Sequence, residues 1–483
     1  MELLIAGGIY KAHLLMRPRE RWPQGRIARY RAARLAGLRA HALRHSSFYR
    51  EFHPDGLDRP LERLPTLTKA TVMANFDRLV TDPKIRLGDA QRHVRDAQGE
   101  ERYLGRYRVQ LTSGTTGRVG LTLFDRAAWT GLLSSWVRAE DWAGLPINPV
   151  KRTRQASVAS VSPWSTSGQV SESLQSWWAP TVRLVAGSPL PEIIETLNAW
   201  RPAVLVTYAS MVRILAEEQR AGRLSIRPRV VFSTGEVQTP EDRRLGAVTW
   251  GREPFDQYAT TETGILAAEC REGRRRHLMD DLNVIEVVDD DDRPVPPGTW
   301  GSRVLVTPLA NRVTPLIRYV LDDRLRLTDE PCPCGRQLRV VTGIQGRSEE
   351  VLRLPAGAGG DVQIDPQTYH PILDRLPVSG WQVSVDGDRF VVLLAGADRT
   401  GDAAIDDATV AAELDRVLTA RGARLAHIDV HHVDEIPKTS AGKAPVVRPD
   451  DRADRWSDDR ADLRPDPRSD PRPPGGSATG TGA

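Results

Sequence analysis

Short apolar runs alternate with amphipathic segments from about residue 100 to residue 340. Apolar runs of about four to eight residues are typical of buried strands. Segments with apolar residues three or four positions apart are typical of helices that bury one face. Their alternation predicts an α/β fold with a mainly parallel sheet. The predicted strands are Val204–Tyr208, Val230–Ser233, Val284–Val288 and Val304–Thr307, and the predicted helices include Glu192–Trp200 and Met211–Arg220.

The amino-terminal region has a helical pattern. Residues 26–46 are rich in Arg, Ala and Leu with apolar spacings of three and four, which predicts a surface helix. Lys11 and His13 interrupt the apolar stretch before Met16, and no small-residue cleavage site follows, so we interpret it as a docked helix rather than a signal peptide. No apolar run approaches the ~20 residues that a membrane-spanning helix needs.

The pattern changes near residue 345. Trp381–Val385 and Arg389–Leu394 flank Asp386-Gly387, a favourable hairpin turn, and a helix at 403–421 and a strand at 428–433 follow. We therefore expect a large amino-terminal domain over 1–345, with 1–65 as a helical lead-in, and a small mobile α+β domain over 346–448. Residues 449–483 have too few apolar side chains to offset their ordering entropy, which predicts a disordered tail.

The composition narrows the class of protein. A net charge of only +4 on 483 residues argues against a dedicated nucleic-acid binder. Three cysteines are too few for a disulfide framework, so we expect a reducing cytoplasm. Only six of the 67 Lys and Arg residues are lysines. A lysine retained in such an arginine-rich chain is therefore more informative than usual.

Three polar segments suggest phosphate chemistry. Leu111–Gly120 has the sequence LTSGTTGRVG, in which glycines permit close backbone approach and hydroxyls can donate to phosphate oxygens. Tyr258–Gly264 places a carboxylate among hydroxyls, which suits a hydrated Mg²⁺. Pro437–Lys443 holds two of the six lysines in a Gly/Ser turn, where an ammonium could neutralise a developing phosphoryl charge. Taken singly, the first segment is equally compatible with a flexible surface turn and the second with a polar loop that caps a helix. The alternative for the third is a solvated turn, which the scarcity of lysine elsewhere disfavours.

The order and spacing of these segments resemble those of the adenylate-forming superfamily, the acyl-CoA synthetases and their relatives. Residues of about 65–445 are similar, most closely to the phenylacetate–CoA ligase branch. The resemblance also rests on Ser233–Glu236, Pro315–Tyr319 with Asp323, and Gly346-Arg347. It implies a large α/β domain followed by a small mobile domain.

The resemblance implies a role for each matching residue. Lys443 would bind the α-phosphate and the acid oxygens during adenylation, Thr261 and Glu262 would hold Mg²⁺ and the α-phosphate, and Glu349 would lie at the hinge. The expected ATP- and AMP-binding residues are Ser113, Thr115 and Thr116 for the β- and γ-phosphates, Gly235 and Glu236 beside adenine, Tyr258 stacked on it, Asp323 at the ribose hydroxyls, and Arg347 at ribose or phosphate.

The chain departs from the family pattern at three places. The family's phosphate loop usually ends in lysine, whereas this chain has Arg118 and Gly120. Ala259 stands where glycine is usual after the tyrosine, and Leu321-Asp322 replaces the usual Thr-Gly. These departures weaken the detailed phosphate assignments and leave the acid and lysine set intact.

All three cysteines join one histidine in a candidate metal site. Cys270, His277, Cys332 and Cys334 offer three thiolates and one imidazole, a donor set suited to tetrahedral Zn²⁺. The phenylacetate–CoA ligase branch often has a Cys/His cluster at these places. The alternative is two turns with reduced thiols.

The implied activity is ATP-dependent adenylation of a small, aromatic carboxylic acid and its transfer to coenzyme A, in a specialised metabolic role. The alternatives are adenylation of nitrite to diazotise an aromatic amine, an amide-forming ligase, and a non-catalytic adenylate-binding regulator. We expect ATP, Mg²⁺, coenzyme A and structural Zn²⁺ as cofactors. Small molecules are the expected partners of a monomer or homodimer, with no nucleic acid and no membrane. Trp164, Trp177 and Trp178 could line an aromatic pocket, although core packing is the commoner role of tryptophan.

Overall fold

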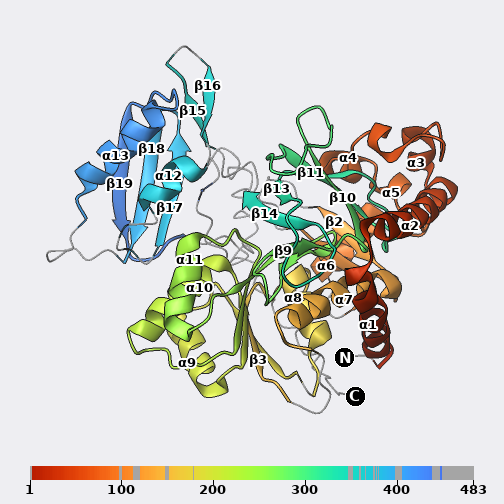
Figure 1. Ribbon diagram of the computed structural model, residues 1–483, viewed down its shortest axis with the longest axis horizontal. Helices are drawn as coiled ribbons and strands as arrows, with labels where there is room; N and C mark the ends of the chain where they lie inside the picture. Colours follow the sequence, from red (N-terminus) through yellow and green to blue (C-terminus); the bar gives the residue numbers. More distant parts are fainter. Residues whose placement is uncertain are drawn as a thin grey trace, which may run out of the picture.

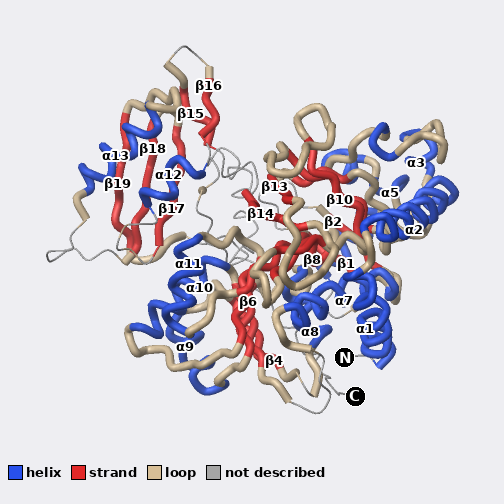
Figure 2. Tube along the Cα trace, in the orientation of Figure 1, coloured by secondary structure: helices blue, strands red, loops and turns tan. Residues whose placement is uncertain are grey.

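The structure is a computed structural model in which a large α/β body carries a smaller carboxy-terminal unit at one side (Figure 1). It describes residues 3–96, 101–112, 120–146, 152–177, 179–345, 352–357, 360–364, 366–373, 376, 378, 380–396, 405–437 and 447–448. Helices surround the strands of the body, as the colouring in Figure 2 shows.

A nine-stranded sheet with the order β13-β14-β9-β8-β7-β6-β5-β3-β4 forms the centre of the body. The five strands from β4 to β7 are parallel to one another, and the pairs from β7 to β13 are antiparallel. The predicted α/β class is confirmed. The strands are β3 (Gln155–Ala159), β4 (Thr181–Val185), β5 (Val204–Thr207), β6 (Val230–Thr234), β7 (Phe255–Thr260), β8 (Gly264–Glu269), β9 (Arg276–Leu278), β13 (Arg324–Thr328) and β14 (Val340–Gln345).

Helices cover both faces of this sheet. Apolar residues of α9 and α10 pack with β3, β5 and β6 in one buried cluster, and α7 packs on β8 in another. Local signals fix the helix ends: Thr239 and Asp242 form a capping box at the start of α11, and Gly251 ends it with φ of 71°. The helices are α7 (Arg126–Trp142), α8 (Thr166–Leu174), α9 (Leu190–Trp200), α10 (Ala209–Arg220) and α11 (Pro240–Trp250).

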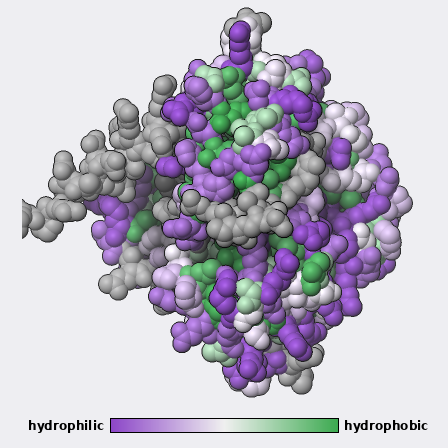
Figure 3. Space-filling view, turned by 90° about the vertical axis from the view of Figure 1, so that its left-hand side faces the viewer, coloured by the Kyte–Doolittle hydropathy of each residue, from purple (hydrophilic) through white to green (hydrophobic). Residues whose placement is uncertain are grey.

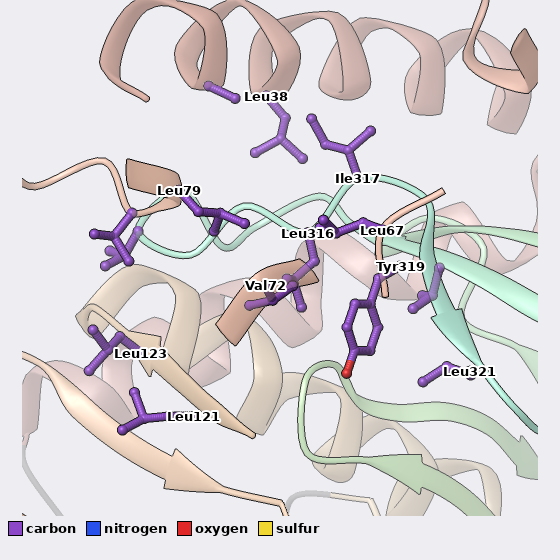
Figure 4. Packing of buried hydrophobic residues seen from close by; sticks show 14 of the residues in the cluster. Leu38, Leu67, Val72, Leu79, Leu121, Leu123, Leu316, Ile317, Tyr319 and Leu321 are labelled. Atoms are coloured by element: carbon purple, nitrogen blue, oxygen red, sulfur yellow. The ribbon is translucent and has the colours of Figure 1, made fainter. Parts of the chain in front are cut away.

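A second, antiparallel sheet consists of β10 (Asn283–Val288), β11 (Arg303–Pro308) and β12 (Tyr319–Leu321). It contains the predicted strands at 284–288 and 304–307. No helix separates β10 from β11, so these strands pair with each other and do not join the parallel part of the large sheet. Leu316, Ile317 and Tyr319 lie close to the Leu67–Val72 segment in the core between this sheet and the amino-terminal helices (Figure 4).

The amino-terminal part contains several helices and one antiparallel pair of strands. The predicted helix at 26–46 is confirmed as α2. No helix of the described part is both long enough and apolar enough to cross a bilayer. The elements are α1 (Leu3–Met16), η1 (Arg17–Arg21), α2 (Gln24–His45), α3 (Ser47–Phe52), η2 (Leu61–Arg63), α4 (Lys69–Ala74), α5 (Phe76–Leu79), α6 (Leu87–Asp96), β1 (Arg108–Leu111) and β2 (Leu121–Phe124).

The carboxy-terminal unit has its own buried cluster. The predicted hairpin is confirmed as β17 and β18, and Gly387 in its turn has φ of 62°. β19 lies parallel to β18, and α13 makes the crossover between them. Hydrophobic residues form separate patches between hydrophilic ones on the face in Figure 3. The elements are β15 (Leu352–Pro355), β16 (Asp361–Ile364), α12 (Pro366–Leu373), β17 (Gly380–Asp386), β18 (Arg389–Ala395), α13 (Asp407–Thr419) and β19 (His427–Val433).

Candidate active site and metal centre

The carboxyl ends of β5, β6 and β7 meet at one edge of the parallel sheet. Tyr208 follows β5, Gly235 follows β6, and Tyr258 lies near the end of β7. In open α/β sheets, ligands bind in the crevice outside this edge. The residues expected beside adenine are therefore brought to one place.

Gly235 and Glu236 form the turn after β6. Gly235 has φ of 77°, a left-handed conformation that glycine adopts without strain. Glu236 accepts a hydrogen bond from the backbone N–H of Ser210 at 2.9 Å, which ties this turn to the start of α10. The turn is therefore held by the neighbouring crossover.

Glu262 is buried in the turn between β7 and β8, directly after Thr261. The hydroxyl of Tyr319 donates to Oε1 of Glu262 at 3.0 Å. Gly264 closes the turn with φ of 76°, and a Cβ there would lie 2.8 Å from Cγ of Leu132 on α7. Close packing on α7 and one phenol thus fix the carboxylate that was predicted to hold Mg²⁺.

Asp323 lies between β12 and β13 and contacts Tyr258. The Tyr258 hydroxyl donates to Oδ2 of Asp323 at 2.6 Å, and both side chains are half-buried. The residues predicted for adenine and for ribose are therefore neighbours. Pairing with a phenol leaves the carboxylate of Asp323 further lone pairs for other donors.

The hydroxyl-rich loop is described only at its base. The backbone N–H of Thr112 donates to the carbonyl of Gly120 at 2.9 Å, and the N–H of Gly120 donates to Oγ1 of Thr112 at 2.7 Å. These bonds hold the two ends of the loop together. The predicted residues Ser113, Thr115, Thr116, Arg347, Glu349 and Lys443 lie outside the described residues.

The four predicted metal ligands come together beside β8 and β9. The donor atoms of Cys270, His277, Cys332 and Cys334 all lie within 4.8 Å of one another, and all four residues are buried. Sγ of Cys270 is 3.5 Å from Sγ of Cys332, and Sγ of Cys334 is 3.3 Å from Nε2 of His277. A tetrahedral Zn²⁺ with Zn–S bonds of about 2.3 Å has sulfurs about 3.8 Å apart, so this donor set fits the ion.

The surroundings of the cluster lower the pKa of Cys270 and Cys334, whereas burial raises the pKa of Cys332 to about 12. Burial raises the pKa of Cys334, but hydrogen bonds from His277 and Arg336 outweigh burial and lower its pKa. Nδ1 of His277 lies 3.3 Å from the carbonyl of Leu338, which directs Nε2 toward the cysteines. Gly273 permits the close approach, because a Cβ there would lie 2.4 Å from Sγ of Cys332.

A buried ion-pair network joins the metal cluster to the amino-terminal segment. Arg336 donates to Glu20 at 3.0 Å, and its backbone N–H lies 3.5 Å from Sγ of Cys334. Glu20 also lies 3.4 Å from Arg138, which pairs with Asp281 at 2.6 Å. No local sequence pattern indicated this network, because its members are far apart along the chain.

The tryptophans predicted to line an aromatic pocket differ in their exposure. Trp164 is half-buried and packs against the main core cluster, whereas Trp177 is 69% exposed. Trp178 lies outside the described residues. The pocket therefore remains a prediction.

Solved structures of acyl-CoA ligases have the same architecture as this chain. A 2-hydroxyisobutyryl-CoA ligase, in the postadenylation state with an acyl-AMP, matches with a TM-score of 0.71 and 20% identity over 92% of this chain and 93% of that chain. An open conformation of the same ligase, with 2-HIB-AMP and CoA, matches with a TM-score of 0.58 and 20% identity over 89% and 93% of the two chains. The chain thus has the fold of the adenylate-forming CoA ligases.

The sequence is similar to that of a phenylacetate–coenzyme A ligase from Thermus thermophilus, with 29% identity over 218 residues. The match covers 41% of this chain and 44% of that ligase, which is less than half of the relative's length. No protein-family model matches the chain. The predicted resemblance is confirmed over this range.

Proposed function

We propose that the protein is an ATP-dependent adenylate-forming ligase that activates a small, aromatic carboxylic acid and transfers it to the thiol of coenzyme A. The observation that carries the proposal is the pairing of two carboxylates with two phenols beside the crevice. Glu262 is held by Tyr319, and Asp323 is held by Tyr258. The fold and the sequence similarity support the same activity.

In the first half-reaction, an oxygen of the acid attacks the α-phosphorus of ATP in line, and the bond to the bridging oxygen of pyrophosphate breaks. Tyr258 stacks on adenine and Asp323 accepts hydrogen bonds from the ribose hydroxyls, so the α-phosphorus is oriented before attack. Lys443 offsets the charge that develops on the α-phosphate oxygens. Mg²⁺ bound with ATP would neutralise phosphate charge, and Glu262 and Thr261 offer the oxygen ligands that it prefers.

In the second half-reaction, the thiol of coenzyme A attacks the acyl carbon and AMP leaves. The small domain, residues 346–448, rotates about 346–349, withdraws Lys443 and admits the thiol. Ser113, Thr115, Thr116 and Arg347 bind phosphates or ribose in the first conformation. Because the two conformations use different groups, the two half-reactions can be tested separately.

Pyrophosphate release tests the proposal. Purified protein is given ATP and Mg²⁺ with a panel of aryl and arylacetic acids, with nitrite plus an aromatic amine, or with no acid. We expect release with an aromatic acid, and an acyl-CoA product when coenzyme A is added. Release only with nitrite plus the aromatic amine would replace the carboxylic acid as the substrate class. No pyrophosphate release in any of these assays would favour a non-catalytic adenylate-binding role.

Lys443→Ala separates the half-reactions. The variant should lose about 10²-fold or more in adenylation and retain transfer from a synthetic acyl adenylate, because one preorganised donor is removed from the first step only. Equal losses in both steps would contradict this division of roles.

We also propose that the cluster of Cys270, His277, Cys332 and Cys334 holds a structural Zn²⁺. Three thiolates and one imidazole close the coordination sphere and leave no position for a substrate. The ion would join the β8–β9 hairpin to the segment before β14. Metal analysis of protein purified without added zinc should give about one zinc per chain; a content near zero with normal activity would refute it.

A further inference from the structure

Helix α1 packs on the body with one face only. Ile9, His13 and Met16 are buried, and their spacing of four and three residues places them on a single side of the helix. A Cβ built on Gly8 would lie 2.9 Å from Cγ2 of Thr130, so α1 is seated closely on α7. The opposite side of α1 is therefore held toward solvent.

The outward side of α1 is mostly apolar. Tyr10, Leu14 and Leu15 are 55%, 50% and 52% exposed, so each leaves about half of its surface in water. Together with the exposed Lys11, they repeat at three and four residues and form one stripe along the helix, called here the α1 stripe. A helix that is apolar all round is normally covered all round. The α1 stripe therefore indicates an interaction surface.

The chain around the α1 stripe carries charge of one sign. Residues 7–50 contain ten arginines, one lysine and a single acidic residue, Glu20, which is buried. Arg19 and Arg31 pair with buried aspartates, but most of the other basic residues extend into water. The net charge of the whole chain conceals this excess, because acidic residues elsewhere cancel it. The exposed basic residues from α1 to the middle of α2 are Lys11, Arg17, Arg21, Arg26, Arg29 and Arg34.

The charge and the α1 stripe together define the partner. Helices α1 and α2 lie at the edge of the body opposite the carboxy-terminal unit (Figure 1). A second copy of the chain seated on the same stripe would bring like charges together, which opposes such pairing. The partner must supply negative charge beside an apolar region. A bilayer that contains anionic lipids does so, because charged headgroups lie directly above the acyl chains.

We propose that α1 and the adjoining basic surface of η1 and α2 bind anionic lipid membranes. Tyr10, Leu14 and Leu15 enter the boundary between headgroups and acyl chains, and the exposed arginines lie against the headgroups. The expectation of no membrane partner rested on the absence of a run long enough to span a bilayer, whereas a helix that lies in the interface needs no such run. The carboxy-terminal unit faces away from the bound surface, so binding leaves it unobstructed. The inference does not rest on the proposed adenylating function.

Co-sedimentation with vesicles tests the contribution of the α1 stripe. Vesicles of phosphatidylcholine and phosphatidylglycerol are compared with vesicles of phosphatidylcholine alone. We expect the wild type to bind the anionic vesicles, and Leu14→Ser/Leu15→Ser to weaken this binding about 10- to 100-fold, because two half-exposed leucines lose their transfer from water. Val248→Ser, which removes an equally exposed apolar side chain from α11, should bind like the wild type.

A second variant tests the contribution of the charge. Lys11→Gln/Arg29→Gln/Arg34→Gln removes three exposed positive charges. Each basic residue near an anionic surface is worth about fivefold in affinity, so the triple variant should bind up to about 100-fold more weakly. Added salt should weaken the wild type by screening the same attraction. Lys84→Gln, which removes an exposed lysine outside the surface, should leave the affinity unchanged.

The binding assay contains no ATP, so its outcome is independent of pyrophosphate release. Wild-type protein that does not sediment with anionic vesicles, or that binds phosphatidylcholine alone equally well, would overturn the inference. An unchanged affinity of the leucine variant or of the charge variant would also overturn it. A dimer that Leu14→Ser/Leu15→Ser disrupts, without vesicle binding by the wild type, would identify a second copy as the occupant of the α1 stripe instead. Thermal unfolding checks that each variant folds, and Leu14→Gln serves if the double leucine variant does not.

Discussion

Tyr258→Phe removes the hydroxyl that donates to Asp323 and leaves the aromatic ring in place. The bond is 2.6 Å long and joins a phenol to a carboxylate, so it is a charge-assisted hydrogen bond. The proposed stacking on adenine should be retained, because phenylalanine has the same ring. The substitution therefore tests how far the phenol orients the carboxylate proposed to bind ribose.

The exposure of the Tyr258–Asp323 hydrogen bond determines how strongly Tyr258→Phe should weaken ATP binding. Hydrogen bonds to charged groups contribute about 1.5–3 kcal/mol. Tyr258 and Asp323 are both half-buried, so water can partly replace the lost donor, and the lower end of the range applies. A loss of about 1.4 kcal/mol is tenfold in binding. We expect KM for ATP to rise about tenfold while kcat changes by less than about threefold.

The assay is ATP–pyrophosphate exchange at saturating acid, with KM for ATP and kcat determined separately. Tyr319→Phe is the matched comparison, because it removes the phenol from Glu262 at 3.0 Å. Because Glu262 is proposed to act beside the reacting phosphate, this variant should lower kcat more than it raises KM. If Tyr258→Phe lowered kcat and left KM unchanged, the assignment of Asp323 to ribose would be wrong.

Three further substitutions test the framework around the site. Asp281→Asn leaves the fully buried Arg138 without its main partner, so the free energy of unfolding should fall by about 3–5 kcal/mol in denaturant titrations; a change below about 1 kcal/mol would contradict the buried pair. Gly273→Ala places a methyl group 2.4 Å from Sγ of Cys332, so chelator competition should show faster metal release. An unchanged rate would contradict the claim that the cluster needs a glycine at this position. Burial raises the pKa of Glu217 to about 7, so the folded protein favours the protonated carboxyl group. The stability that this group contributes is fully present below the unfolded pKa of ~4.5 and is lost as the pH rises through 7. Glu217→Gln should therefore raise Tm at pH 8 and leave it unchanged at pH 4, and an equal shift at both values would argue against this titration.

Local patterns predicted the elements around the site but not the contacts between them. The strand before Gly235 follows from the apolar run Val230–Ser233, and the polar turn at Glu262 follows from the hydroxyls of Tyr258–Gly264. The bond from Tyr319 to Glu262 spans 57 residues and depends on how two sheets meet, which periodicity does not report.

The two antiparallel strands β10 and β11 also show that local patterns predict elements but not the contacts between them. Their sequences are as apolar as those of β5 and β6, so the pattern predicted strands correctly. Their sheet was not predictable from the runs alone, because pairing depends on the connection. Residues 289–302 join β10 to β11 without a helix, whereas helix α10 joins β5 to β6.

The metal cluster has a consequence for the order in which the chain is assembled. Cys270 and Cys332 are 62 residues apart, and closing a loop of that length in an unfolded chain costs roughly 4 kcal/mol. In the folded chain, β8, β9 and β14 have already closed it. The folded protein should therefore bind the ion roughly a thousandfold more tightly than the unfolded chain does. On the proposal that the cluster holds Zn²⁺, the ion would therefore bind after the sheet has formed and would stabilise the structure that the strands have built.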